Sequence, residues 1–207
     1  YKETGSVIYD ASSNPVQINS DNGKVSSIYD YDNKLPVATV INATTDDIAY
    51  TSFETESLGG WSMNLGSSYV TDKSITGKRS FSGSLNKTLI HPGNYTITLW
   101  CHSSSTVSVN SQSGNLLTII GDWKLFEWKL NSVSSIQVTG GIIDEVRLYP
   151  SIAKMNTVTY DPMIGKTSEC DLGNRITYYE YDGLGRLKLV KDDKKNVIKT
   201  YEYNYKQ

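Results

Sequence analysis

No segment of 11 or more residues in this chain shows a helical period, and turn-forming residues divide the sequence into short runs. Asn22-Gly23, Pro92-Gly93 and Asp182-Gly183 are three such turn signals. Between them lie short runs in which apolar and polar residues alternate, at 7–9, 37–41, 95–101, 124–130, 142–149 and 176–181. The 15 Tyr, against 3 Phe and 3 Met, fit the same picture, since Tyr favours pleated surfaces. We therefore expect an all-β fold.

Tyr-Asp pairs divide the chain into three stretches. They occur only near the two ends, at Tyr9-Asp10, Tyr29-Asp30, Tyr31-Asp32, Tyr160-Asp161 and Tyr181-Asp182. Tyr9 to Tyr31 is 22 residues and Tyr160 to Tyr181 is 21, and a period of this size indicates a structural repeat. The middle stretch has no such pair and carries all 4 Trp. We divide the chain into repeat-like residues 1–44, an inserted module at 45–150 and repeat-like residues 151–207.

The clearest repeat, residues 181–203, is predicted to be a β-hairpin. Asp182-Gly183 begins a turn, and Gly185 permits a positive φ before a strand at 186–190. The polar run 192–196 makes the next turn, and 197–203 returns as a strand. Every second residue from 201 to 205 is Tyr, so one face of that strand is aromatic and needs a neighbouring hairpin to cover it: Tyr201, Tyr203 and Tyr205.

This segment resembles the YD-repeat (RHS-repeat) family, in the string Tyr179-Glu180-Tyr181-Asp182 followed by Gly185-Arg186-Leu187. The resemblance implies a bacterial protein that is secreted or exposed at the cell surface. Long arrays in that family form hollow β-shells, whereas about 100 residues here are repeat-like. We therefore expect this chain to be a piece of a larger YD-repeat protein, whose remainder would be its partner. Asp161-Pro162 begins an Asp-Pro-x-x-Gly string similar to one in self-cleaving relatives, but a single copy predicts no protease.

The middle module resembles galactose-binding-like jelly rolls and the carbohydrate-binding modules built on them. The shared features follow in order: Phe53-Glu54, Gly77-Lys78, Pro92-Gly93, Trp123 and Ile143-Asp144. They span about 100 residues, as a β-sandwich does. The fold that the two resemblances imply is a jelly-roll β-sandwich flanked by YD-repeat β-hairpins.

The jelly-roll resemblance also implies a structural Ca²⁺ ion. Carried onto this sequence, Glu54 and Asp144 would be its side-chain ligands, and backbone carbonyls near Lys78 and Ser80 would complete the shell. Calcium prefers six to eight oxygen ligands of these kinds. The alternative is that Glu54 and Asp144 are ordinary carboxylates at strand ends.

Four residues are candidates for contact with a sugar, because sugar sites combine aromatic faces with hydrogen-bonding side chains. In the strand 95–102, the side chains of Tyr95, Ile97, Leu99 and Cys101 form the predicted core face, which leaves Trp100 and His102 on the opposite face. That outward pair forms a sugar platform unless a second sheet or the repeats cover it. Trp61 and Tyr69, in loop-like sequence, are further candidates. Alternation in 124–130 places Trp128 in the core.

No catalytic constellation is present in the sequence. His91 and His102 have no metal-type spacing, and Asp144 and Glu145, as strand neighbours, should point to opposite faces. The net charge of −2 with dispersed cations predicts no nucleic acid partner, and no apolar run approaches the ~20 residues of a membrane span. The leading hypothesis is a non-enzymatic module that binds a carbohydrate or another surface ligand. The alternatives are a purely structural spacer and, least favoured, a glycosidase-like or self-processing enzyme.

Overall fold

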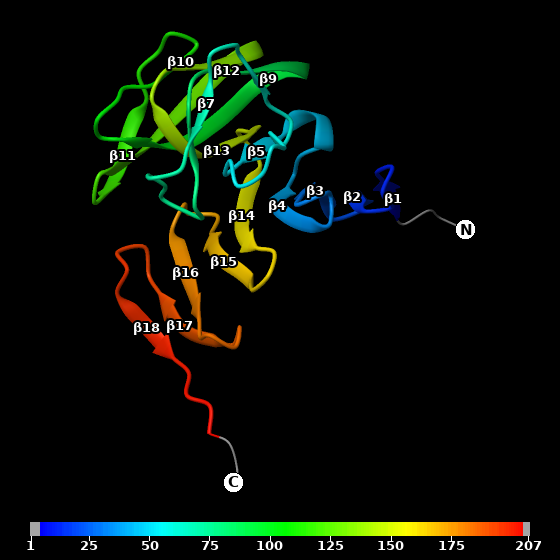
Figure 1. Ribbon diagram of the computed structural model, residues 1–207. Helices are drawn as coiled ribbons and strands as arrows, with labels where there is room; N and C mark the ends of the chain where they lie inside the picture. Colours follow the sequence, from blue (N-terminus) through cyan, green and yellow to red (C-terminus); the bar gives the residue numbers. More distant parts are fainter. Residues whose placement is uncertain (1–4, 205–207) are drawn as a thin grey trace.

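The computed structural model describes residues 5–204 and is all-β, as the alternation predicts. Its strands form two antiparallel sheets (Figure 1). Within the described residues, the helical content is one 3-10 turn at Thr45–Asp47. No helix in this range has the length and apolar character needed to cross a bilayer.

The first sheet, which we call the meander sheet, is built from both ends of the chain. Its nine strands run in the order β1-β2-β3-β4-β14-β15-β16-β17-β18. Strand β4 pairs directly with β14, with Ile41 opposite Lys154 and Ala38 opposite Thr157. The strands are β1 Gly5–Tyr9, β2 Pro15–Ser20, β3 Gly23–Asp30, β4 Leu35–Ile41, β14 Lys154–Asp161, β15 Gly165–Cys170, β16 Ile176–Tyr181, β17 Leu187–Lys191 and β18 Val197–Thr200.

Four turns of the meander sheet share one hydrogen-bond pattern, centred on an Asp. One carboxylate oxygen accepts the N–H groups two and four residues on, and the other bonds the side chain four residues on. The residue three positions on has a φ between 64° and 74°. Gly185, at 74°, fulfils the sequence prediction for its turn. The four pairs are Asp10 with Asn14, Asp171 with Arg175, Asp182 with Arg186 and Asp192 with Asn196.

The end of the last hairpin differs from the prediction. Strand β18 stops at Thr200, so Tyr201 and Tyr203 lie beyond it, and Tyr205 is outside the described residues. The Tyr203 hydroxyl donates to the Leu187 carbonyl at 2.7 Å, and the Arg186 guanidinium lies 4.3 Å from the Tyr203 ring centroid. This ring therefore packs back onto its own hairpin.

The second sheet folds over on itself into a β-sandwich. Strands β9 and β12 pair along most of their length, with register shifts between Leu130 and Ser135. Both halves of β9 supply side chains to one core, which indicates that the ribbon bends around it. The strands are β5 Ala49–Thr51, β6 Ser62–Met63, β7 Ser68–Val70, β8 Ser80–Ser82, β9 Leu85–His102, β10 Ser108–Val109, β11 Asn115–Ile120, β12 Trp123–Thr139 and β13 Ile142–Pro150. The predicted core residues are buried there: Tyr95, Ile97, Leu99, Cys101 and Trp128.

The meander sheet packs on the outer face of the sandwich. In one contact cluster, Trp100 and Leu125 of the sandwich meet Cys170, Ile176 and Tyr178 of β15 and β16. Trp100 is 1% exposed. Its side chain faces away from the sandwich core, as alternation predicts, but the meander sheet covers it. The sequence left open whether Trp100 is exposed or covered by another part of the chain, and in the structure it is covered.

Candidate functional site

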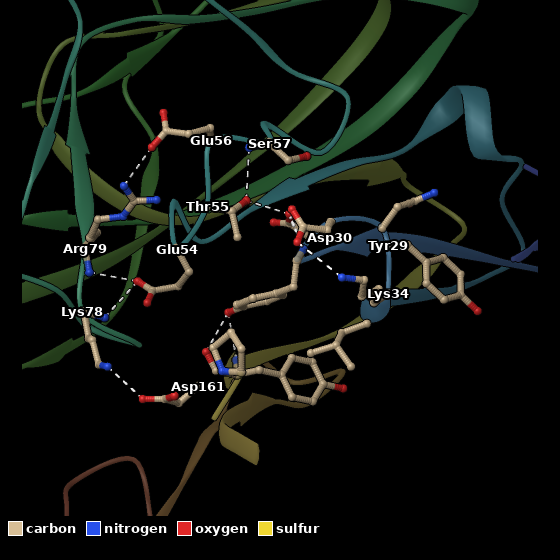
Figure 2. Close-up of a pocket in the computed structure, with 16 residues that line it drawn as sticks. Tyr29, Asp30, Lys34, Glu54, Thr55, Glu56, Ser57, Lys78, Arg79 and Asp161 are labelled. Atoms are coloured by element: carbon tan, nitrogen blue, oxygen red, sulfur yellow. Dashed lines mark hydrogen bonds and ion pairs between the residues drawn. The ribbon is translucent and has the colours of Figure 1, made fainter. Parts of the chain in front are cut away.

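An open groove of about 1090 Å³ lies where the two sheets meet (Figure 2). The meander sheet contributes residues 29–35, from the end of β3 to the start of β4, and residues 160–162 at the end of β14. The sandwich contributes residues 54–57 and 78–79. Its volume is slightly above the ~300–1,000 Å³ typical of ligand sites.

Two tyrosines fix the meander side of the groove. The rings of Tyr31 and Tyr160 meet edge to face with centroids 5.7 Å apart. The Tyr31 hydroxyl donates to the Tyr160 carbonyl at 2.9 Å and accepts the Tyr160 N–H at 3.0 Å. The Tyr160 hydroxyl donates to the Pro36 carbonyl at 3.1 Å. Burial raises the pKa of Tyr31. The bonds hold both rings in place without a ligand.

Two carboxylates accept hydrogen bonds that connect the segments lining the groove. Glu54 accepts the N–H groups of Lys78 and Arg79 at 2.9 and 2.8 Å. Asp30 accepts the Tyr31 N–H and the Thr55 hydroxyl, both at 2.6 Å, and the second of these bonds joins the sheets. Burial raises the pKa of both carboxyls, against the opposing effect of these hydrogen bonds.

The groove carries more negative than positive groups. Each lining cation has an acidic partner: Lys34 with Asp32 at 3.5 Å, Lys78 with Asp161 at 2.8 Å and Arg79 with Glu56 at 3.1 Å. Asp30 and Glu54 are two further lining carboxylates. The lining thus offers aromatic surface, several hydrogen-bonding groups and a net negative charge.

The four residues predicted to contact a sugar do not line this groove. Trp100 and Trp61 are buried, at 1% and 6% exposure, so neither offers a face for stacking. His102 is half-buried, with Nδ1 2.7 Å from the Ser104 hydroxyl. Tyr69 is half-buried under the Arg79 guanidinium, which lies 4.4 Å from its ring centroid. The exposed Trp100–His102 platform is therefore wrong, because the meander sheet occupies the space in front of Trp100.

The two carboxylates predicted to bind calcium accept hydrogen bonds from backbone N–H groups of the loop 75–79. Asp144 accepts the N–H groups of Ile75 and Thr76 at 2.9 and 3.2 Å, and Glu54 accepts those of Lys78 and Arg79. The Lys78 side chain reaches Asp161, and Ser80 is buried in β8. A calcium shell needs six to eight oxygens directed at the ion. In the structure, oxygens of both carboxylates are engaged with N–H donors of the loop 75–79. The described contacts do not fit the expected shell.

Asp144 and Glu145 differ from their predicted geometry. Strand register shifts between Asp144 and Arg147, and Glu145 has a φ of 52°. This bulge breaks the alternation, so Thr76 bonds both carboxylates: its N–H reaches Asp144 and its hydroxyl reaches Glu145 at 2.7 Å. Burial and the neighbouring Glu145 charge raise the pKa of Asp144. Both side chains are 2% exposed or less, so a substrate has no access to the pair.

The groove residues were missed because they come from four distant segments. One signal was present in the sequence. The turns beginning at Asp30 and Asp161 lack the Asn or Arg found four residues after Asp in the other turns and have Lys34 and Gly165 instead. Without that partner, Asp30 bonds Thr55 and Asp161 bonds Lys78, both in the sandwich.

The fold and the groove together define an all-β protein with a candidate ligand site between two sheets. No protein-family model and no curated protein matches the sequence. Among solved structures, the chain is similar to the CBM22-1 xylan-binding domain of Xyn10C from Paenibacillus barcinonensis, with 16% identity and a TM-score of 0.33. The match covers 50% of this chain and 94% of that domain.

Proposed function

We propose that this protein binds a neutral glycan, without catalysis, in the groove between its two sheets. The observation that carries the proposal is the composition of that groove. It combines tyrosine rings with carboxylate, hydroxyl and guanidinium groups in an open hollow of about 1090 Å³. Sugars present apolar ring faces edged by hydroxyls, and such a lining complements both.

The charges of the groove select for a neutral ligand. Its three cations are already paired with carboxylates, while Asp30 and Glu54 add negative charge. A uronic acid or sulfated sugar would meet repulsion from these groups. A neutral sugar would find acceptors for its hydroxyls.

The wider setting is also part of the proposal. The sandwich would be a jelly roll of the carbohydrate-binding type, presented by YD-repeat hairpins of a larger, secreted or surface-exposed bacterial protein. The ordered motifs of the middle module and the Tyr-Asp period support this reading. Calcium is left out of the proposed site because Glu54 and Asp144 already bond loop amides.

Affinity electrophoresis tests the proposal. The probes are neutral polysaccharides (xylan, mixed-linkage β-glucan and galactomannan) and the acidic polygalacturonate. We expect retardation by at least one neutral polymer and none by the acidic one. Tyr29→Ala, at the edge of the groove, should weaken binding about tenfold or more, which is the loss of about 1.4 kcal/mol. Tyr9→Ala, at an exposed Tyr that also precedes an Asp, should bind like the wild type. Binding of no neutral polymer, or an unaffected Tyr29→Ala, would overturn the proposal.

A purely structural role is the second candidate. It is favoured by the burial of Trp100 beneath the meander sheet and by the bonds that Arg147 of β13 makes to β14, β15 and the turn after it. Such an interlocked pair of sheets would serve as a rigid spacer. A stable protein that binds no glycan in the assay above is the result this candidate predicts.

A further inference from the structure

A second, smaller hollow adjoins the groove. It measures about 200 Å³ and shares Glu54, Lys78, Tyr160 and Asp161 with the groove. Its far side is formed by β15 and β16, with Tyr178 and Tyr179 among the lining residues. The two hollows are therefore neighbours along one surface.

The ion pair between Lys78 and Asp161 marks the boundary of the two hollows. Figure 2 shows the two side chains facing each other at one side of the groove. Lys78 Nζ lies 2.8 Å from Asp161 Oδ2. The Lys78 side chain is 75% exposed. The Asp161 side chain is only 15% exposed, so a ligand parts this pair by displacing the solvent-exposed Lys78 end. Asp161 then keeps the hydrogen bond that it accepts from the Met163 N–H at 3.0 Å.

The small hollow is too small to be an independent site. Its volume of about 200 Å³ is below the range of ~300–1,000 Å³ usual for ligand pockets. It offers tyrosine rings and hydrogen-bonding groups, with Lys166 Nζ 4.5 Å from the centroid of the Tyr179 ring and Lys195 Nζ 2.9 Å from that of Tyr178. Tyr179 is half-buried, with its hydroxyl 3.2 Å from Glu169, and Tyr178 is held by a bond from its hydroxyl to the Ile75 carbonyl at 2.9 Å. Such a hollow can take one end of a ligand that is anchored elsewhere.

We propose that the ligand is a chain of several sugar units that fills the groove, passes the Lys78–Asp161 pair and places its end against Tyr179. This inference rests on the proposed glycan-binding function and adds the size and shape of the ligand. Adding sugar units across the boundary brings new contacts without a second loss of translational freedom. Affinity therefore increases with chain length until the small hollow is occupied.

Isothermal titration calorimetry with xylo-, cello- and manno-oligosaccharides, from disaccharides to hexasaccharides, tests the inference. In the wild type we expect an affinity gain of about tenfold or more between the shortest and the longest members of the series that binds. Tyr179→Ala should remove this gain and leave the affinity for the shortest binding member unchanged. Tyr9→Ala is the matched control and should keep the gain.

The outcomes separate the two proposals. Binding with equal affinity at every length, or a length gain that survives in Tyr179→Ala, overturns the extended-chain inference and leaves glycan binding in place. Failure of every oligosaccharide and every neutral polysaccharide overturns both. The wild-type length series decides the matter even if Tyr179→Ala does not fold.

Discussion

Replacing Arg147 with Met should weaken the contact between the two sheets and lower the free energy of unfolding. Arg147 lies in β13 of the sandwich and is 2% exposed. Its guanidinium donates to the Thr157 hydroxyl at 2.5 Å, the Cys170 carbonyl at 2.9 Å and the Asn174 side-chain oxygen at 2.9 Å. All three acceptors belong to strands or turns of the meander sheet. The Glu145 carboxylate lies 4.0 Å from Arg147 Nε.

The expected loss follows from what the substitution leaves behind. Met keeps most of the buried volume, so the main cost comes from the groups that lose their partner. These are the Glu145 carboxylate, which is also buried, and the three acceptors of the meander sheet. Removing one member of a buried ion pair costs about 3–5 kcal/mol of unfolding free energy. Glu145→Gln removes the stranded charge, so the double variant should lose less than the sum of the two single variants.

Urea unfolding followed by tryptophan fluorescence measures this loss. The four Trp lie in residues 45–150, and two of them, Trp100 and Trp123, lie in the cluster against the meander sheet. Arg175→Met is the control, because the Arg175 side chain is exposed and its pair with Asp171 is a surface pair worth at most about 1 kcal/mol. The reasoning is refuted if Arg147→Met unfolds within about 1 kcal/mol of the wild type.

Three further predictions use the same interface and loop. Trp100→Ala should lower the unfolding free energy by about 3–5 kcal/mol in urea, because it empties a buried site between the sheets; a loss under about 1 kcal/mol would mean that the sheets do not cover it. The hydrogen bond from Lys78 lowers the pKa of Asp161, so Lys78→Met should raise that pKa in an NMR titration. A pKa that is lowered in the folded state stabilises the protein above the unfolded-state pKa of Asp161, and this stability is lost as the pH falls. Lys78→Met should therefore reduce the loss of unfolding free energy at acid pH. An unchanged Asp161 pKa would contradict the contact between the two side chains. EGTA should leave the melting temperature unchanged, because Glu54 and Asp144 bond loop amides; a fall that calcium reverses would restore the calcium site.

Local patterns predicted the parts of the fold that local physics determines. Alternation gave the core face of β9, because side chains in a regular strand alternate between faces. The Asp182 turn was predicted because Gly185 tolerates a positive φ. The same rule failed at Glu145, since a bulge with a positive φ at a non-glycine residue leaves no mark in the alternation.

The candidate site could not be predicted in the same way. Asp30, Thr55, Lys78 and Asp161 come from four segments, and only the packing of one sheet on the other brings them together. The cover over Trp100 is equally non-local, because Ile176 and Tyr178 follow it by more than 70 residues. The sequence marks Asp30 and Asp161 only by the missing Asn or Arg four residues later, and it does not show which residues of the sandwich they meet.

The direct pairing of β4 with β14 determines how the protein would respond to tension. Both ends of the sandwich connect to these neighbouring strands, where Ile41 lies opposite Lys154. A pull on the two termini is therefore transmitted from strand to strand through the meander sheet. The backbone connects the sandwich to the sheet only at the ends of β4 and β14, so the force does not pass through it while these two strands are paired. It bears force only after the β4–β14 hydrogen bonds have broken. The groove between the two sheets would therefore keep its shape under tension for as long as β4 and β14 stay paired.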